Sequence, residues 1–177
     1  PLAGISQSLN SIEAVEYDHD NSRFLVTNSS SIIAIDHQTQ ELSYFGNGTA
    51  THGMEVMNNT LFAISGGVIK GYDLTTEDEV MSLSISGAGF LNGMASDGLG
   101  RLWVTDFSNK DVIEIDVTDI DNPTYETVVS NTVSTPNGIV YDETNDRLIF
   151  VNWGGSAAIK TVNLDTYAVS TITNTSL

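Results

Sequence analysis

A similar segment recurs four times along this 177-residue chain, and this repeat limits the possible folds more than any other feature of the sequence. The repeats open at Glu13, His52, Asn92 and Asn137. Consecutive openings lie 39, 40 and 45 residues apart, and 40 residues follow the last one. A period of this length is typical of folds in which each repeated unit buries its apolar face against its neighbours. The chain is therefore predicted to be a repeat protein with four units.

Each repeat contains four short segments in which Val, Ile, Thr, Phe and Tyr alternate with polar residues, separated by turns rich in Asp, Asn and Gly. Such alternation predicts β-strands, and no segment has the sustained 3.6-residue apolar spacing of a helix. The second segment of each repeat is strongly apolar and is expected in the middle of its sheet, whereas the polar fourth segment is expected at the rim. The second segments are Arg23 to Thr27, Leu61 to Ser65, Arg101 to Asp106 and Arg147 to Trp153.

Four short strands in every repeat describe the blade of a β-propeller, in which four-stranded antiparallel sheets pack face to face. We therefore predict an all-β chain, with a single propeller domain or fragment spanning residues 1–177. The blades are predicted at residues 10–48, 49–88, 89–132 and 133–177. Part of a larger propeller of the six-bladed type is favoured, and a four-bladed ring or two paired arcs are the alternatives. An open arc would leave apolar blade faces able to associate with other copies.

The charge of the chain disfavours one class of partner. Acidic residues number 23 against 6 Lys and Arg, which gives a formal net charge of -17. Nucleic-acid binding requires clustered basic side chains that neutralise phosphates, so no nucleic-acid partner is expected. No stretch approaches the roughly 18 consecutive apolar residues of a membrane span. An extracellular or periplasmic location is favoured by the acidic composition, the scarcity of lysine and the Asn-X-Ser/Thr sequences that begin at Asn28, Asn47 and Asn58.

The residues at the repeat openings are the candidate functional residues. In a propeller, the start of the first strand of each blade points at the central channel, so Glu13, His52, Asn92 and Asn137 are expected to face it. A carboxylate and two amide oxygens are hard ligands that suit calcium, or magnesium as an alternative. His52 would add a nitrogen and shift the preference towards zinc or manganese. Because the chain contains no cysteine, thiolate metal sites are excluded.

Two motifs carry a resemblance to a known group of proteins. Gly100 to Asp106 reads Gly-Arg-Leu-Trp-Val-Thr-Asp, and Thr135 to Ile139 reads Thr-Pro-Asn-Gly-Ile. Both motifs resemble the blades of the senescence-marker-protein/gluconolactonase-like superfamily and of the related NHL-repeat and strictosidine-synthase-like propellers. The resemblance covers almost the whole chain, and it is specific to this group of propellers rather than to one activity within the group.

The resemblance implies a divalent metal in the channel and hydrolysis of sugar lactones. By position, Glu13 and Asn137 match metal ligands of those enzymes, and Asn92 matches a further Asn on the metal or substrate side. The family's general-base Asp would lie one repeat after Asn137, at a position beyond Leu177. The chain also departs from the family pattern after Glu13, where Ala14 and Val15 replace a typical Gly-Pro. His52 is a weak substitute candidate for the base, because an imidazole titrates near neutral pH.

A purely structural reading of the same residues is also available. Asn-Gly and His-Gly pairs often serve to turn the chain into a strand, and a channel carboxylate can be solvated without binding anything. Asp18 to Asn21 resembles the opening of a calcium loop, but it lacks the glycine and the closing glutamate, so we predict a turn. Trp103 and Trp153 lie in second segments, where packing between blades is expected.

Three functions follow from these observations. The leading prediction is a secreted or periplasmic propeller that acts as a binding or scaffold module for a small-molecule or carbohydrate-type ligand. The second is a metal-dependent sugar-lactone hydrolase whose catalytic Asp lies beyond this chain. The third is a structural unit that associates with itself through its blade faces.

Overall fold

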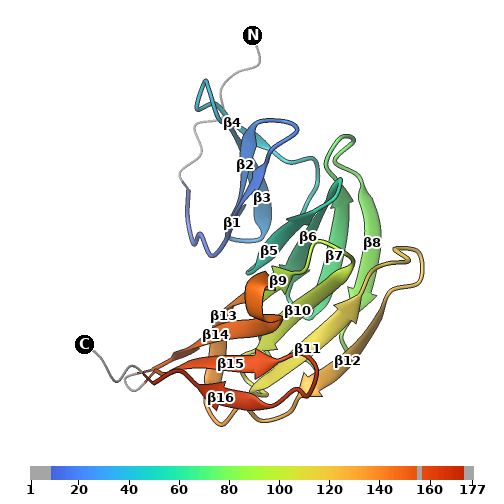
Figure 1. The fold of residues 1–177 in the computed structure, drawn as a ribbon. Coiled ribbons are helices and arrows are strands. Elements are labelled where there is room, and N and C mark those ends of the chain that lie inside the picture. Colours follow the sequence, from blue (N-terminus) through green and yellow to red (C-terminus); the bar gives the residue numbers. More distant parts are fainter. Residues whose placement is uncertain (1–8, 155–156, 174–177) are drawn as a thin grey trace. The chain divides into compact units, whose positions relative to one another are not determined.

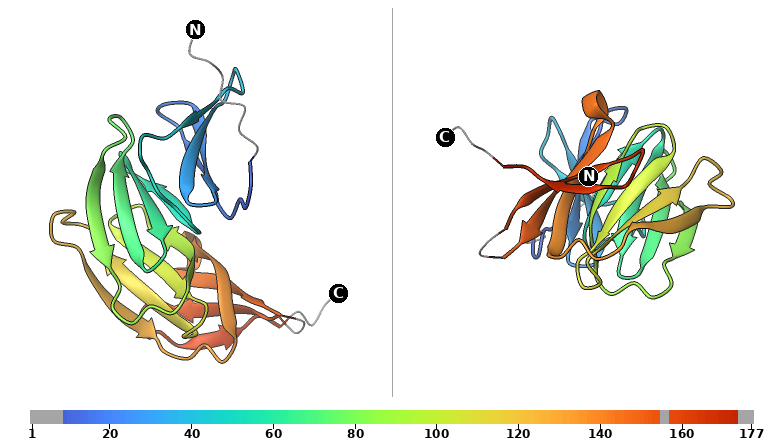
Figure 2. Two further views of the ribbon diagram at one scale, coloured as in Figure 1. Left: turned by 180° about the vertical axis from the view of Figure 1, so that it is seen from behind. Right: turned by 60° about the horizontal axis from the view of Figure 1, so that its bottom comes forward.

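The computed structural model describes residues 9–154 and 157–173. Within these residues the chain forms sixteen β-strands in four separate four-stranded sheets, with one short 3-10 helix, η1 (Glu143–Asn145) (Figure 1). In every sheet the strands follow one another in sequence order, and each neighbouring pair is antiparallel. The four four-stranded antiparallel blades predicted from the repeat are confirmed. Each blade is a twisted sheet, as the two further views show (Figure 2).

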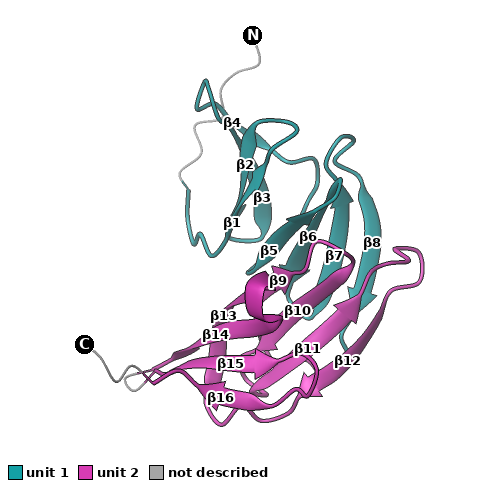
Figure 3. Cartoon of the chain, in the orientation of Figure 1, with its two compact units in different colours: residues 1–86 teal, residues 87–177 magenta. Residues whose placement is uncertain are grey.

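The chain divides into two compact units, residues 1–86 and residues 87–177, and each unit contains two blades (Figure 3). In unit 1, blade 1 consists of β1 (Val15–Asp18), β2 (Arg23–Asn28), β3 (Ser31–Asp36) and β4 (Leu42–Tyr44). Blade 2 consists of β5 (Met54–Met57), β6 (Thr60–Ser65), β7 (Val68–Asp73) and β8 (Glu79–Ser84).

Unit 2 contains the other two blades. Blade 3 consists of β9 (Leu91–Ser96), β10 (Arg101–Asp106), β11 (Asp111–Asp116) and β12 (Thr124–Val129). Blade 4 consists of β13 (Thr135–Asp142), β14 (Arg147–Trp153), β15 (Ile159–Asn163) and β16 (Val169–Thr171). In both units the first strands of the two blades lie side by side, β1 with β5 and β9 with β13.

The two blades of each unit are held together by one apolar core. In unit 1 the core is formed by Leu25, Ile32, Ala34, Phe45, Ala50, Met54, Leu61, Ala63, Tyr72 and Leu74. In unit 2 it is formed by Ala95, Trp103, Val112, Val129, Ile139, Leu148, Phe150, Val162 and Leu164. Buried apolar area is the main stabilising contribution to such packing. As predicted, the second strand of each blade lies in the middle of its sheet, with three to five buried side chains, and the fourth strand lies at the sheet edge with mainly exposed side chains.

Two hydrogen-bond patterns recur in the turns of the blades. At the end of the third strand, an Asp or Asn side chain accepts backbone N–H bonds from residues two or three positions later, which fixes a tight turn. These residues are Asp36, Asp73, Asp116 and Asn163. At the end of the first strand, in three of the four blades, an Asp accepts a bond from the Arg that opens the second strand. The pairs are Asp18–Arg23, Asp97–Arg101 and Asp142–Arg147, with N–O distances of 2.9, 2.8 and 2.7 Å.

The turn predicted at Asp18 to Asn21 is therefore an Asp-centred turn. The buried carboxylate of Asp18 accepts bonds from the backbone and side chain of Asn21 as well as from Arg23. The two tryptophans differ from each other. Trp103 is fully buried and stacks on Tyr141 of blade 4, as predicted, whereas Trp153 is 69% exposed although its ring lies 6.0 Å from that of Phe107. In the described part of the chain, no helix is long and apolar enough to cross a membrane.

Candidate functional site

The four predicted site residues all lie at or just before the first strand of a blade. In unit 1, Glu13 precedes β1 by two residues and His52 precedes β5 by two residues. In unit 2, Asn92 is the second residue of β9 and Asn137 is the third residue of β13. Glu13 is exposed, and the other three side chains are partly buried.

Glu13 and His52 are close enough to influence each other. The backbone N–H groups of Glu13 and Ala14 both donate to the hydroxyl of Thr27, at 2.8 and 3.0 Å, which fixes the chain at the entry to β1. The Nδ1 atom of His52 lies 3.0 Å from the hydroxyl of Thr51. Partial burial lowers the pKa of His52, and the negative charge of Glu13 opposes this effect in part. His52 is therefore a neutral imidazole at pH 7, beside a carboxylate.

Asn92 and Asn137 lie on neighbouring first strands whose backbones almost touch. The hydroxyl of Thr105 joins the two strands, because it donates to the Asn137 carbonyl at 2.7 Å and accepts from the Gly93 N–H at 2.8 Å. A Cβ atom at Gly93 would lie well inside van der Waals contact of the Asn137 carbonyl oxygen and 3.1 Å from the Gly138 Cα. The two Asn residues are thus held at a fixed separation by the packing of β9 on β13.

The two Asn-Gly pairs are not turns. Both Gly93 and Gly138 lie inside strands, and neither has a positive φ angle. Gly93 is required because another backbone approaches it closely. The register of β13 against β14 shifts between Pro136 and Ile139, so Asn137 and Gly138 occupy an irregularity in the sheet. Such irregularities redirect side chains and are frequent near binding sites.

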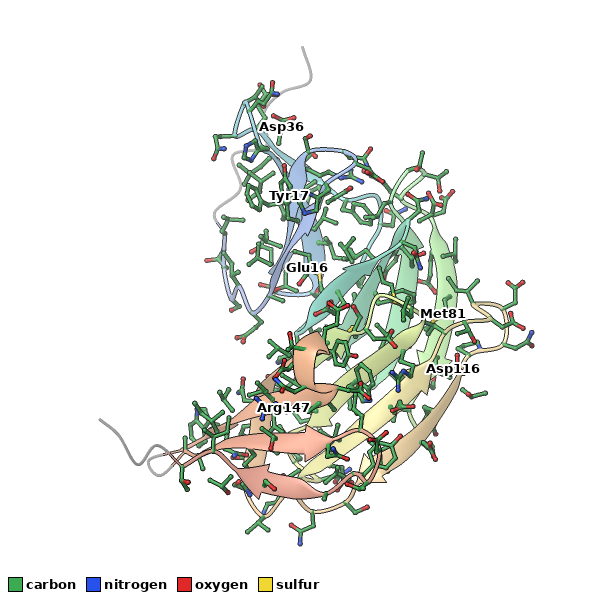
Figure 4. The ribbon with its side chains drawn as sticks, viewed as in Figure 1. Glu16, Tyr17, Asp36, Met81, Asp116 and Arg147 are labelled. Carbon is green, nitrogen blue, oxygen red and sulfur yellow. The ribbon has the colours of Figure 1, made fainter. Side chains whose placement is uncertain are left out.

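Glu16 is a residue of this region that the sequence did not single out. It projects from β1 into the packing between blades 1 and 2, where the backbone N–H of Val56 donates to its carboxylate (Figure 4). Burial raises the pKa of Glu16 to about 7, and the Val56 bond opposes the shift only in part. Ala95 of blade 3 pairs with the central strand of its sheet as Glu16 does in blade 1. The same position is Val140 in blade 4 and Glu55 in blade 2, so blades 1 and 2 have a carboxyl group where blades 3 and 4 have an apolar side chain.

Replacing Glu16 with Gln should stabilise the protein at neutral and alkaline pH. Because the folded state holds the Glu16 proton more tightly than the unfolded state, the stability that this group contributes is complete below a pKa of 4.5 and is lost as the pH rises through about 7. After discounting for partial exposure, Glu16→Gln should add about 1–2 kcal/mol at pH 8 and nothing near pH 4. Urea unfolding followed by circular dichroism at both pH values measures the difference.

The exposed Glu41 provides the control for this prediction, since Glu41→Gln removes one charge without removing a buried carboxyl group. Glu41→Gln should change stability by less than about 0.5 kcal/mol at either pH. Equal effects of the two substitutions at pH 8 would contradict the assignment of a buried carboxyl group at Glu16.

A second polar surface lies on blade 3. A cavity of about 280 Å³ is lined by Glu114, Asp116, Thr124, Tyr125 and Glu126. The carboxylate of Glu114 already accepts bonds from the indole N–H of Trp103 and the hydroxyl of Tyr167. Asp116 binds the backbone and hydroxyl of Thr118 (Figure 4). These two carboxylates therefore have structural roles within unit 2.

The predicted metal ligands are divided between the two units. Glu13 belongs to unit 1, and Asn92 and Asn137 belong to unit 2. Within residues 9–154 and 157–173, no three His, Asp or Glu side chains are grouped so that they could hold a metal ion. The carboxylate and amide oxygens are of the type that calcium prefers. The metal site therefore stays a prediction.

Comparisons with known proteins define the fold but no family. No protein-family model and no curated protein matches the sequence. A chain in the crystal structure of a nidogen/laminin complex is similar, with a TM-score of 0.75 and 16% sequence identity over 92% of this chain and 65% of that chain. The Cps50 (Swd1) β-propeller domain of Myceliophteria thermophila gives 0.72 and 11% over 94% of this chain and 57% of that chain. The chain has the β-propeller fold.

A third similar structure is a protein of unknown function from Bacteroides thetaiotaomicron. It has a TM-score of 0.72 and 11% identity, over 94% of this chain and 44% of that chain. This propeller chain thus spans 44% to 65% of the length of the three solved chains. At these identities the similarity shows the fold alone, and it carries no activity from one protein to another.

Proposed function

We propose that this propeller is a binding or scaffold module that recognises its ligand through the polar residues at the starts of the first strands. The observation that carries the proposal is the position of Glu13 and His52 at the entries to β1 and β5, which lie side by side, so that the negative charge of the exposed Glu13 acts on the His52 imidazole. The fixed spacing of Asn92 and Asn137 on β9 and β13 supplies two further polar side chains of the same kind. An Asn side chain can both donate and accept hydrogen bonds while it is uncharged, so it can bind a ligand that carries no charge.

The chemistry of these residues favours a neutral, hydroxyl-rich ligand of the carbohydrate type. An overall charge of -17 disfavours anionic ligands, and none of the four side chains is basic at neutral pH. One similar propeller comes from a nidogen/laminin complex, which supports protein binding as an alternative use of this fold. An extracellular or periplasmic location agrees with both kinds of ligand, and it rests on the composition of the sequence.

A divalent cation is the second ligand that we propose, with calcium preferred. Glu13, Asn92 and Asn137 would supply oxygen ligands to it, and magnesium, manganese and zinc are alternatives. When bound, such an ion would polarise a ligand oxygen. The relationship to gluconolactonase-like proteins, and with it lactone hydrolysis, rests on the sequence resemblance alone.

Thermal unfolding of the chelator-treated protein tests this proposal. Calcium, magnesium, manganese, zinc and a panel of neutral sugars are added one at a time, and the unfolding midpoint is followed by circular dichroism. A ligand present at 100 times its dissociation constant stabilises the folded state by about 2.7 kcal/mol, which corresponds to a rise of roughly 5–10 °C for a chain of this size. We expect at least one addition to produce such a rise, and we expect Glu13→Gln or Asn137→Ala to abolish it.

Glu41→Gln is the matched control, because Glu41 is an exposed carboxylate outside the site. A rise that survives both Glu13→Gln and Asn137→Ala would place the ligand elsewhere on the protein. A midpoint that no cation and no sugar raises would remove both proposed ligand classes and leave protein binding as the alternative.

A further inference from the structure

The blade-to-blade interface within unit 1 and the one within unit 2 use equivalent residues, and they define two kinds of blade face. In each unit, the face of the first blade that contacts the second blade is called the receiving face. The face of the second blade that contacts the first blade is called the packing face. The receiving face of blade 1 contains Leu25, Ile32 and Phe45, and that of blade 3 contains Trp103, Val112 and Val129. The packing face of blade 2 contains Met54, Leu61, Ala63 and Tyr72, and that of blade 4 contains Ile139, Leu148, Phe150 and Val162.

Strand register shows that these positions correspond from blade to blade. On the packing faces, Leu61 pairs with Tyr72 as Leu148 pairs with Val162. On the receiving faces, the backbone N–H of Phe45 donates to the Ile32 carbonyl, and Val129 pairs with Val112 at the same place in blade 3. The interface between blades is therefore a repeated structure, and its residues can be located in any blade.

Blade 4 has a receiving face of its own, and that face is exposed. The pair Val140–Ile149 in blade 4 corresponds to the pair Ala95–Trp103 in blade 3. In the same way, the Ile172 N–H donates to the Ile159 carbonyl where Val129 pairs with Val112 in blade 3. Val140, Ile159 and Ile172 are 58%, 47% and 45% exposed, whereas their counterparts Ala95, Val112 and Val129 are buried. Blade 4 thus has an apolar surface equivalent to the one with which blade 3 contacts blade 4.

Blade 1 has the matching packing face. The pair Val15–Val26 in blade 1 corresponds to the pair Ile139–Phe150 in blade 4. The pair Phe24–Ile35 likewise corresponds to the pair Leu148–Val162. Val15 is 57% exposed, and the Phe24 and Ile35 side chains are partly exposed. Tyr17 occupies the place of Tyr141, the residue that stacks on Trp103 in unit 2 (Figure 4).

We propose that the receiving face of blade 4 binds the packing face of blade 1 in a second copy of this chain. Both faces of the repeated interface are present in one sequence, and each has the residues that form that interface elsewhere in the molecule. Such a contact is heterologous, because it joins two different surfaces, and it extends from copy to copy or closes into a ring. In the proposed contact, Tyr17 of one copy lies on Ile149 of the other, because these two residues correspond to Tyr141 and Trp103.

The polar contacts at the edges of the two observed interfaces indicate which residue of blade 1 would lie at the edge of the proposed one. Glu77 of blade 2 binds Arg23 of blade 1, and the Tyr167 hydroxyl of blade 4 donates to Glu114 of blade 3. Glu77 and Tyr167 both have a positive φ angle in the turn after the third strand, and Gln40 has the same conformation in blade 1. In the proposed contact Gln40, whose amide donates to the His37 carbonyl within its own blade, would lie near the Arg147–Asp142 ion pair at the edge of blade 4. An amide can bond both of these charged groups.

Sedimentation equilibrium of the 177-residue chain tests the proposal. The measurement is made at about 0.15 M salt or above, so that repulsion between the acidic chains is screened. We expect a mass at or above twice the chain mass of 19.0 kDa, which falls to 19.0 kDa on dilution. Ile159→Asp on the receiving face and Val15→Asp on the packing face should each weaken association at least tenfold. Both substitutions are at exposed strand positions, and far-UV circular dichroism verifies folding.

Mixing the two variants gives the sharpest outcome. Each variant keeps one intact face, so the mixture should form a heterodimer of twice the chain mass, although neither variant associates alone. Leu99→Asp is the matched control, because Leu99 is an exposed apolar residue in the turn between β9 and β10 and should not affect association. A monomer at every concentration would overturn the proposal, as would variants that associate normally or fail to combine.

Discussion

Gly93→Ala should lower the free energy of unfolding by about 2–4 kcal/mol, an effect unusually large for the addition of one methyl group. The new Cβ atom would overlap the Asn137 carbonyl oxygen and press on the backbone of Gly138 and Ile139, at 3.1 Å from the Gly138 Cα and the Ile139 nitrogen. These atoms belong to β13, which is paired with β14 on both sides of the irregularity at Asn137 and Gly138, so relief of the overlap should move β9 and β13 apart. Urea unfolding monitored by circular dichroism measures the loss.

Moving β9 away from β13 would also separate Asn92 from Asn137 and break the hydrogen bonds of the Thr105 hydroxyl to both strands. A ligand that contacts both Asn side chains should therefore bind Gly93→Ala more weakly than the unsubstituted protein. This second effect links the packing of the first strands to the proposed binding function.

Gly138→Ala is the matched control for this prediction. Gly138 also follows an Asn in the first strand of a blade, but a Cβ atom there would only meet the Val151 Cγ2 at 3.6 Å, an ordinary contact. The expected change is within about 1 kcal/mol and can be stabilising, because alanine restricts the unfolded chain more than glycine does. Equal losses for the two substitutions would show that close backbone approach is not the reason for glycine at position 93.

The blade pattern could be predicted from the sequence because it is local. Alternating apolar residues mark the strands, and residues such as Asp36 and Asp73 close the turns through bonds to residues only two or three positions away. The positions of Glu13, His52, Asn92 and Asn137 at the starts of first strands follow from the same periodicity. Local information of this kind does not require knowledge of which blades touch.

Features that depend on contacts between blades could not be predicted from the sequence. An Asn-Gly pair is normally a turn signal, and only the approach of β13 shows why position 93 must be glycine. Glu16 is a polar residue in an alternating strand, and its raised pKa arises from burial against blade 2. Trp103 and Trp153 occupy similar segments, yet Trp103 is buried beneath blade 4 and Trp153 is largely exposed.

Trp103→Ala is expected to be the most destabilising substitution, with a loss of about 3–5 kcal/mol. The indole ring is fully buried in the core of unit 2 and stacks on Tyr141, with ring centroids 5.4 Å apart. Its N–H donates to the Glu114 carboxylate at 2.7 Å. Removing the side chain leaves a cavity between blades 3 and 4 and deprives a partly buried carboxylate of a donor. Denaturant unfolding gives the loss, and Trp153→Ala, at an exposed position, should cost less than about 1 kcal/mol.

A double-mutant cycle separates the packing of Trp103 from its hydrogen bond. Trp103→Phe keeps an aromatic ring against Tyr141 and removes the N–H donor together with part of the buried ring volume, so it should cost less than Trp103→Ala. Glu114→Gln removes the charge of the acceptor while keeping its shape, and the hydroxyl of Tyr167 still has an oxygen to bind. If the indole–carboxylate bond, which joins β10 and β11 within blade 3, contributes to stability, the two changes together should cost less than the sum of their separate effects, by about 0.5–2 kcal/mol. Additive losses would assign the role of Trp103 to packing alone. In that case the interface between blades 3 and 4 would be stabilised by buried apolar area. The proposed contact of the receiving face of blade 4 with a second copy would depend on the same contribution.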